Sequence, residues 1–178
     1  FNFSGFFLYP LSAPAFLIRH LGVSERAFLW LFGPAMAGMM LGSWLSGHLA
    51  GKISPRATLR RGLLVMVLAA AANVTLNLVL PPMLPWAILP IFVYTIGMAL
   101  TMPSLTLLAL DLFPAQRGLA ASCQSFLQSA VSSLTAGIIA PLIWGSALTL
   151  SLGMSGLLFF GVVSSLSYGV FAMRRTPN

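Results

Sequence analysis

Apolar stretches of about twenty residues fill nearly the whole chain, and each is long enough to cross a ~30 Å hydrocarbon core as a helix. Only 6% of the residues are charged, whereas a soluble domain carries roughly 25%. Lipid contains no water that could solvate a charge, so charged residues are confined to the membrane interfaces. The pattern therefore predicts an all-α integral membrane protein.

Six membrane-spanning helices are predicted, joined by short connections. The chain begins at Phe1, inside an apolar run and without an initiator Met, which predicts that it is a fragment of a longer protein. The single Cys123 cannot form an internal disulfide. The predicted spans cover residues 1–18, 28–48, 62–80, 86–110, 119–140 and 150–173.

The basic residues predict the orientation of these spans. Alternate connections lie on opposite faces of the membrane, and two of the nine basic residues, Arg19 and Arg26, fall on one face. The positive-inside rule therefore assigns the other face, and both ends of the chain, to the cytoplasm. The net charge of +7 is explained by this anchoring, without a nucleic-acid partner. The residues on the cytoplasmic face are Lys52, Arg56, Arg60, Arg61, Arg117, Arg174 and Arg175.

The span 119–140 carries a polar stripe. At 100° per residue, its amides and hydroxyls fall within one arc, and apolar side chains occupy the opposite arc. Such a stripe either makes hydrogen bonds between helices or forms the wall of a water-filled cavity, and its two glutamines favour the cavity. The polar arc contains Gln124, Ser125, Gln128, Ser129, Ser132 and Thr135, and the apolar arc contains Phe126, Leu127, Ala130, Leu134 and Ile138.

Two other spans have features compatible with a cavity. In the span 86–110, Tyr94, Met98, Thr101, Met102 and Leu105 lie within about 100° of arc on the helix. Methionine suits surfaces that accept varied ligands, although ordinary core packing also explains these methionines. The span 1–18 is interrupted by Pro10 and Pro14 next to Tyr9, and broken helices are tolerated in a membrane where they line a cavity.

Small residues at four-residue spacing predict close helix contacts. Gly38, Gly42 and Ser46 form such a series in the span 28–48, and Gly161, Ser165 and Gly169 form another in the span 150–173. In lipid, where helices gain no hydrophobic energy by associating, these positions let backbones approach. No acidic or basic residue lies near the middle of a span, so any proton or ion relay is expected elsewhere.

An enzyme is also conceivable. Residues Gly153, Met154, Ser155 and Gly156 spell the serine motif of rhomboid-type intramembrane proteases, with His48 as a candidate base. However, the topology puts His48 at the cytoplasmic end of one span and Ser155 near the external end of another, about 20 Å away in depth. A nucleophile requires its base within hydrogen-bond reach. The two His and two acidic residues are scattered, so neither an enzyme, a metal site nor a cofactor is predicted.

Three stretches resemble the C-terminal half of a major facilitator superfamily transporter, and most closely the Bcr/CflA-type multidrug efflux branch. Residues 9–18 (YPLSAPAFLI) are similar to that branch's seventh helix, and residues 110–125 (LDLFPAQRGLAASCQS) to its loop between helices ten and eleven. Residues 47–61 (GHLAGKISPRATLRR) resemble the cytoplasmic loop motif G-x-L-A-D-R-x-G-R-R. Gly47, Leu49, Ala50 and Arg56 match the motif, Lys52 replaces an Arg, Gly51 its Asp, Ser54 its Gly and Pro55 its first basic residue.

This resemblance implies that residues 1–178 form the C-terminal bundle of a longer transporter, with six helices arranged as two inverted three-helix repeats. It implies proton-driven export of drugs or small amphipathic or cationic solutes by alternating access, in a bacterial cytoplasmic membrane. The substrate site would lie at the midplane between two halves, and the proton-handling residues in the N-terminal half. A transporter of a nutrient or metabolite, and a stand-alone six-helix protein with a structural or assembly role, remain alternatives.

Candidate functional residues follow from both lines of reasoning. The cytoplasmic gate of the resemblance would involve Gly47, Lys52, Arg56, Asp111 and Arg117, although these charges also serve simply as membrane anchors. Asp111 would pair with Arg117 or with the basic loop. Aromatic, methionine and amide groups suit flat apolar or cationic solutes. The predicted substrate contacts are Tyr9, Tyr94, Met98, Thr101, Met102, Gln124 and Gln128.

Overall fold

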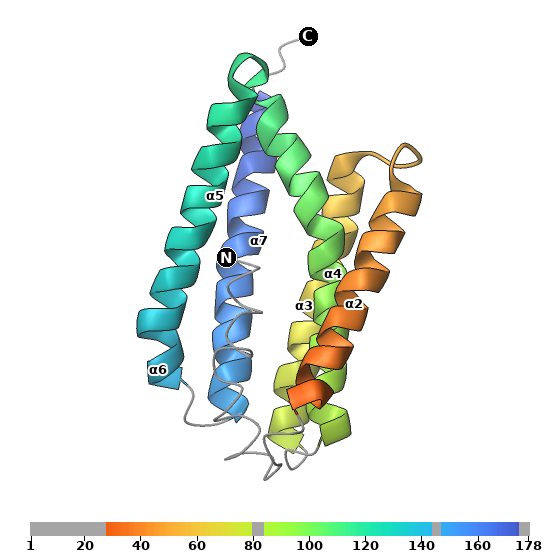
Figure 1. Ribbon diagram of the computed structural model, residues 1–178, viewed down its shortest axis with the longest axis vertical. Helices are drawn as coiled ribbons and strands as arrows, with labels where there is room; N and C mark the ends of the chain where they lie inside the picture. Colours follow the sequence, from red (N-terminus) through yellow and green to blue (C-terminus); the bar gives the residue numbers. More distant parts are fainter. Residues whose placement is uncertain (1–27, 80–83, 144–146, 175–178) are drawn as a thin grey trace.

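The computed structural model describes residues 28–79, 84–143 and 147–174, and these residues form helices and the short turns between them (Figure 1). A helix satisfies its own backbone hydrogen bonds, as lipid requires. The all-α class is confirmed. The elements are α2 (Phe28–Leu49), α3 (Pro55–Val79), α4 (Leu84–Asp111), the 3₁₀ turn η3 (Pro114–Gln116), α5 (Arg117–Leu134), the π turn η4 (Thr135–Ile139), α6 (Ala140–Ile143) and α7 (Ala147–Arg174).

Five of the six predicted spans fall on these helices, and the sixth, at residues 1–18 with Tyr9, lies outside the described residues. Within the described part, four segments are long and apolar enough to cross a membrane. Helix α3 starts at Pro55, seven residues before the predicted span 62–80. Proline suits the first position of a helix, and the Ser54 hydroxyl accepts a hydrogen bond from the Ala57 amide at 3.3 Å. The four segments are Pro55–Val79, Ile88–Asp111, Pro114–Leu142 and Leu148–Ser165.

Helix α4 packs closely against α2 through two glycines. A β-carbon added at Gly38 would collide with the Thr95 hydroxyl and would lie 2.6 Å from the Phe92 carbonyl oxygen. One added at Gly42 would lie 2.5 Å from the carbonyl oxygen of Ile96. The predicted close contact at these two glycines is confirmed, since only a hydrogen side chain lets the backbones come this near.

The contact between α3 and α4 has the same origin. Gly62 of α3 and Gly97 of α4 face each other, and a β-carbon on either would lie 2.8–2.9 Å from the other's carbonyl oxygen. Helix α4 therefore approaches one neighbour on each side, and α2, α3 and α4 form one tightly packed unit.

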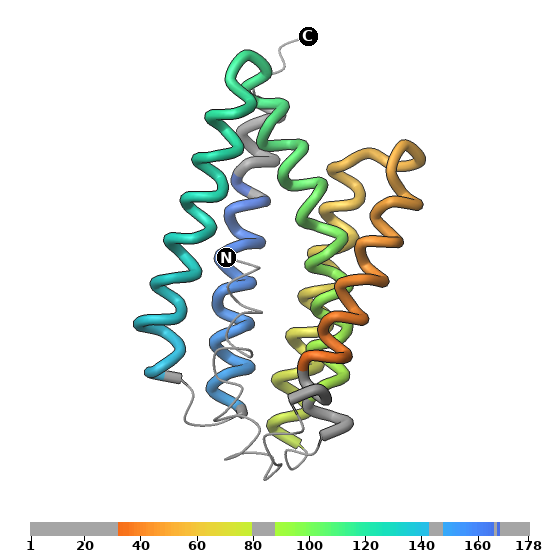
Figure 2. The backbone as a smooth tube through the Cα atoms, in the orientation of Figure 1, coloured from red at the N-terminus to blue at the C-terminus, as the bar shows by residue number. Residues whose placement is uncertain are grey.

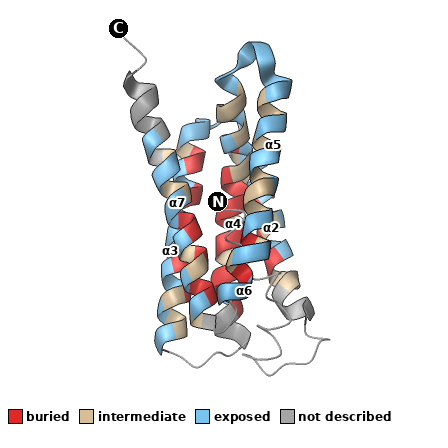
Figure 3. Cartoon of the chain, turned by 90° about the vertical axis from the view of Figure 1, so that its left-hand side faces the viewer, coloured by how far each residue is buried: buried red, intermediate tan, exposed pale blue. Residues whose placement is uncertain are grey.

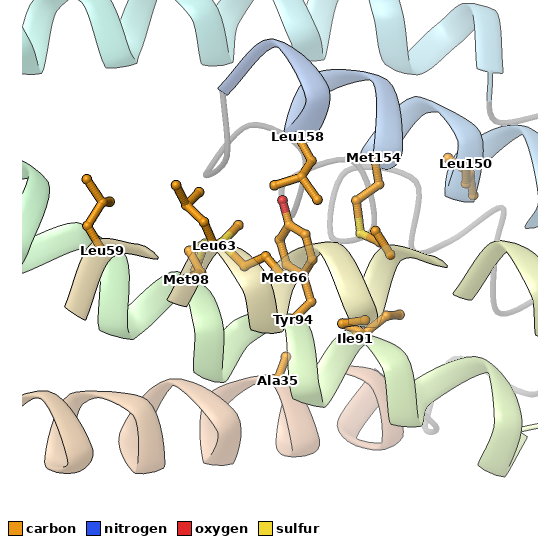
Figure 4. Packing of buried hydrophobic residues seen from close by; sticks show 12 residues of the cluster. Ala35, Leu59, Leu63, Met66, Ile91, Tyr94, Met98, Leu150, Met154 and Leu158 are labelled. Atoms are coloured by element: carbon orange, nitrogen blue, oxygen red, sulfur yellow. The ribbon is translucent and has the colours of Figure 1, made fainter. Parts of the chain in front are cut away.

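A buried apolar cluster joins this unit to α7. Figure 4 shows Tyr94 of α4 between α3 and α7, close to Met66, Met154 and Leu158. Tyr94, Met66, Leu150 and Met154 are completely buried. The described members of the cluster are Ala35, Leu59, Leu63, Met66, Ala69, Ala70, Ile91, Tyr94, Met98, Leu150, Met154 and Leu158.

Helix α5 is attached much less extensively. It has no buried residue, and its contacts with α4 are few (Figure 3). It continues through η4 into α6 as one helical run (Figure 2). The π turn has a local cause: Pro141 has no N–H for the Gly137 carbonyl and its ring crowds that carbonyl, and the Ala140 amide bonds to Thr135, five residues back.

The α2–α3 loop, the α4–α5 turn and the last described turn of α7 lie at the same end of the bundle (Figure 1). Gly51 in the first loop has a φ of 79°, in the left-handed region that favours glycine. Lys52, Arg56 and Arg117 are exposed at this end. We call it the basic end.

The glycine contacts of α4 lead to a first prediction. Gly42→Ala should lower the free energy of unfolding of the full-length protein in detergent by about 1–3 kcal/mol, the usual effect of overpacking. Gly156→Ala is the matched control, because a β-carbon at Gly156 of α7 meets nothing within 4 Å. Thermal unfolding midpoints should fall for the first variant only. Equal midpoints would show that α2 and α4 can separate at no cost.

Candidate functional site

A pocket of about 350 Å³ lies between α3, α4, α5 and α7. It occupies the half of the bundle nearer the basic end, because α3 lines it with residues near its start and α4 with its last turns. Ligand pockets in proteins commonly measure about 300–1,000 Å³, so this one suits a small organic molecule. The lining residues are Leu59, Leu63, Thr101, Met102, Leu105, Leu108, Ala109, Leu112, Gln124, Leu127, Gln128, Val131, Gly161, Ser164 and Ser165.

The pocket wall is mostly apolar, and none of its lining side chains is charged. Its polar groups are two amides on α5 and hydroxyls on α4 and α7. Two of the hydroxyls are engaged within their own helices: Thr101 donates to the Met98 carbonyl at 2.9 Å, and Ser164 to the Phe160 carbonyl at 2.8 Å. The amides are therefore the strongest polar features of the wall.

Gln124 joins α5 to α4. Its side-chain nitrogen donates to the Thr106 hydroxyl at 2.9 Å. Its side-chain oxygen Oε1 is buried and has no hydrogen-bond partner among the described residues. A buried acceptor left unpaired costs about 1–3 kcal/mol. Such an atom at a pocket wall is a candidate contact for a bound molecule.

The predicted substrate contacts separate into two groups. Thr101, Met102, Gln124 and Gln128 line the pocket. Tyr94 and Met98 do not: the structure places them in the apolar cluster, 0% and 1% exposed. The sequence places all the α4 residues on one arc, but the surroundings of that arc change along the helix axis. Its first part lies in the apolar cluster, and only its last two turns reach the pocket.

The polar stripe of α5 also lies differently from the prediction. The side facing the pocket consists of Gln124, Leu127, Gln128 and Val131, so Leu127 belongs to the wall although the sequence puts it on the opposite arc. Ser125 and Ser129 are exposed and lie outside the lining. The arc of α5 that faces the pocket is thus rotated from the predicted polar arc toward the apolar arc. Helix α5 therefore turns only one edge of its polar stripe toward α4.

The contribution of α7 was expected to be helix packing. Instead, Gly161 and Ser165 line the pocket, where their small side chains leave room between α7 and α5. A pair of small residues one turn apart has the same sequence pattern in a close contact and in a cavity wall. Leu59 and Leu63 of α3 complete the wall without any sequence signal.

Comparison with known proteins identifies the family. The sequence model of the Major Facilitator Superfamily matches residues 1–136. The chain belongs to the Major Facilitator Superfamily. It is 27% identical over 169 residues to an uncharacterized MFS-type transporter, YdgK, of Bacillus subtilis (strain 168). That alignment covers 94% of this chain and 40% of the relative, so the chain spans less than half of the relative's length. No solved structure gives a significant match.

The residues of the superfamily's cytoplasmic loop motif lie at the basic end. Lys52 and Arg56 are exposed, and Gly47 faces open space. Asp111 pairs with Arg117 at 3.5 Å, rather than with the basic loop. Both side chains are more than 60% exposed, at 62% for Arg117 and 65% for Asp111, so the pair contributes about 0–1 kcal/mol.

The residues of the protease motif have other contacts. The Ser155 hydroxyl donates to the Ser151 carbonyl at 2.8 Å. His48 stacks on Trp44, with ring centroids 4.1 Å apart, and its Nδ1 lies 3.2 Å from the Trp44 carbonyl oxygen. Each side chain thus interacts within its own helix.

The burial of Tyr94 leads to a second prediction. Tyr94→Ala should destabilise the full-length protein by about 3–5 kcal/mol, because it leaves a cavity in the apolar cluster. Phe126→Ala on the exposed face of α5 is the control, since Phe126 is 72% exposed. The measurement is the amount of folded protein by size-exclusion chromatography and its thermal midpoint. A Tyr94→Ala protein as stable as the wild type would show that Tyr94 lies in a cavity instead.

Proposed function

We propose that residues 1–178 are the C-terminal transmembrane bundle of a secondary active transporter that exports small amphipathic solutes by alternating access. Membership of the superfamily and the similarity to an MFS-type transporter support the transporter class. The observation that carries the substrate class is the pocket, which combines an apolar wall with two glutamine amides.

The character of this wall favours amphipathic solutes over common metabolites. Arg and Lys are the side chains that most often bind phosphorylated and carboxylated metabolites, and no lining residue of this pocket is charged. A flat apolar molecule with one or two polar groups matches the leucines, Met102 and the amides. A cationic ring is also compatible with it, through the polarizable Met102 sulfur and the amide oxygens.

Coupling to protons is part of the proposal and is assigned to the other half of the transporter. A proton relay within a membrane needs an ionisable group at membrane depth. The pocket lining provides none. Export driven by inward proton flow therefore requires an acidic residue in the N-terminal half, which would also complete the substrate site.

The basic end is assigned to the cytoplasm, in a bacterial inner membrane. In this proposal Lys52 and Arg56 contact the N-terminal half when the cytoplasmic side closes, with Gly47 allowing the approach and the Asp111–Arg117 pair bracing the neighbouring turn. The exposure of Lys52 and Arg56 supports this role, because they make no ion pair within the described residues.

Transport itself provides the third prediction. In the full-length transporter, Ser165→Phe should fill the pocket and reduce efflux of the dye proflavine at least tenfold. Gln128→Ala should reduce it about fivefold, as expected for one lost hydrogen bond. Ser129→Ala, one residue further along α5 and outside the lining, should have no effect. Dye efflux from loaded cells measures this at equal membrane expression. Normal efflux in both pocket variants would contradict the proposed site.

Orientation provides the fourth prediction. In a cysteine-free full-length protein, Gln116→Cys in the α4–α5 turn should be unreactive toward a membrane-impermeant maleimide in intact cells. The same variant should be labelled in inside-out membrane vesicles, because the basic end faces the cytoplasm. Labelling of intact cells would reverse the proposed topology.

A further inference from the structure

Only one of the two polar atoms of the Gln124 side-chain amide has a hydrogen-bond partner among the described residues. Its nitrogen donates to Thr106 on α4, and its oxygen has no partner among the described residues. The side chain lies in the pocket wall beside Gln128 and Leu127. Buried polar atoms are nearly always paired, so an unpaired one at a pocket calls for an explanation.

The hydrogen bond to Thr106 engages one end of the Gln124 amide. A threonine hydroxyl both donates and accepts, so Thr106 can bond to either end of the Gln124 amide. In the orientation that the structure records, the other end, Oε1, is buried and has no partner among the described residues. Gln124 lines the pocket, so this unpaired end belongs to a side chain that borders the cavity.

We propose that Gln124 determines specificity by pairing its unpaired amide oxygen with a hydrogen-bond donor on the transported solute. This inference rests on the proposed function and narrows its substrate class to amphipathic molecules that carry an N–H or O–H group. Thr106 is then a positioning residue, which holds the amide at the wall through the hydrogen bond between α4 and α5.

Two related dyes test this inference. Proflavine and 10-methylacridine orange share a cationic acridine ring, but proflavine carries a ring N–H and two NH₂ groups, whereas 10-methylacridine orange carries a ring N–CH₃ and two N(CH₃)₂ groups and has no N–H donor. The purified full-length transporter should bind both dyes. In Gln124→Met, which keeps the length of the side chain and removes the amide, the dissociation constant for proflavine should rise about tenfold. That for 10-methylacridine orange should stay within twofold.

Two further variants separate pairing with the solute from a structural role. Thr106→Val removes only the bond between the helices, and Ser125→Ala changes a neighbouring exposed residue of α5. If Gln124 only fastened α5 to α4, Gln124→Met and Thr106→Val would weaken both dyes equally, and the inference would be overturned. Thermal midpoints and elution profiles of each variant identify those that do not fold.

The outcome also separates this inference from the proposed function. Suppose that Ser165→Phe abolishes the binding of both dyes and that Gln124→Met weakens both equally. The pocket is then retained as the binding site, and the role of Gln124 is rejected. A wild-type protein that binds neither dye, or a Ser165→Phe protein that binds both normally, rejects the pocket as a site for amphipathic solutes. Selective loss of proflavine in Gln124→Met supports both.

Discussion

The described bundle depends on one constraint: the backbone of α4 lies in direct contact with the backbones of α2 and α3. Water drives helices of soluble proteins together, but lipid is as apolar as their side chains and does not. Association therefore relies on close packing, and Gly38, Gly42, Gly62 and Gly97 provide it by leaving no β-carbon between the helices. Once α3 and α4 are fixed in this way, Met66 and Tyr94 lie side by side and form the surface on which α7 packs (Figure 4). A closely packed three-helix unit with α7 docked on it is the result.

Helix α5 lies outside this constraint, and that explains the pocket. Its pocket-facing side is Gln124, Leu127, Gln128 and Val131, none of them a glycine, so its backbone stays away from α4 and α7. On α7, Gly161 and Ser165 supply no bulk to fill the gap. Large residues bound the remaining space on the sides of α3, α4 and α5, and small residues bound it on the side of α7. The hydrogen bond from Gln124 to Thr106 links α5 to the unit near the basic end, and the π turn at Thr135–Ile139 interrupts the α-helical bonding at its other end.

Periodicity and hydropathy were sufficient to predict the described helices, but not to predict which residues of other helices each helix face contacts. The spans follow from the cost of exposing backbone or charge to lipid, which is a property of each segment alone. Burial of Tyr94 depends on Met66 and on α7, which lie far from it in sequence, so its arc on α4 could not reveal whether it meets a cavity or a core. Similarly, Gly42 and Gly161 belong to the same sequence pattern, yet one meets a carbonyl oxygen and the other a pocket. The two glutamines were identifiable because no lipid-facing position tolerates them at low cost.

The difference between a closely packed unit and a helix with few contacts gives the proposed transport a physical basis. Most of the apolar wall that shapes the pocket belongs to α3 and α4, whereas the two amides belong to α5. A solute that bonds to Gln124 therefore interacts with both parts at once, and its binding energy depends on where α5 stands relative to α4. A ligand shifts a conformational equilibrium only through such a difference in affinity between two states. Leucines alone would bind an apolar solute in nearly the same way at several positions of α5, because apolar contacts have little directionality. A directional amide on the loosely attached helix makes occupancy of the pocket sensitive to the position of that helix, which is the coupling that alternating access requires.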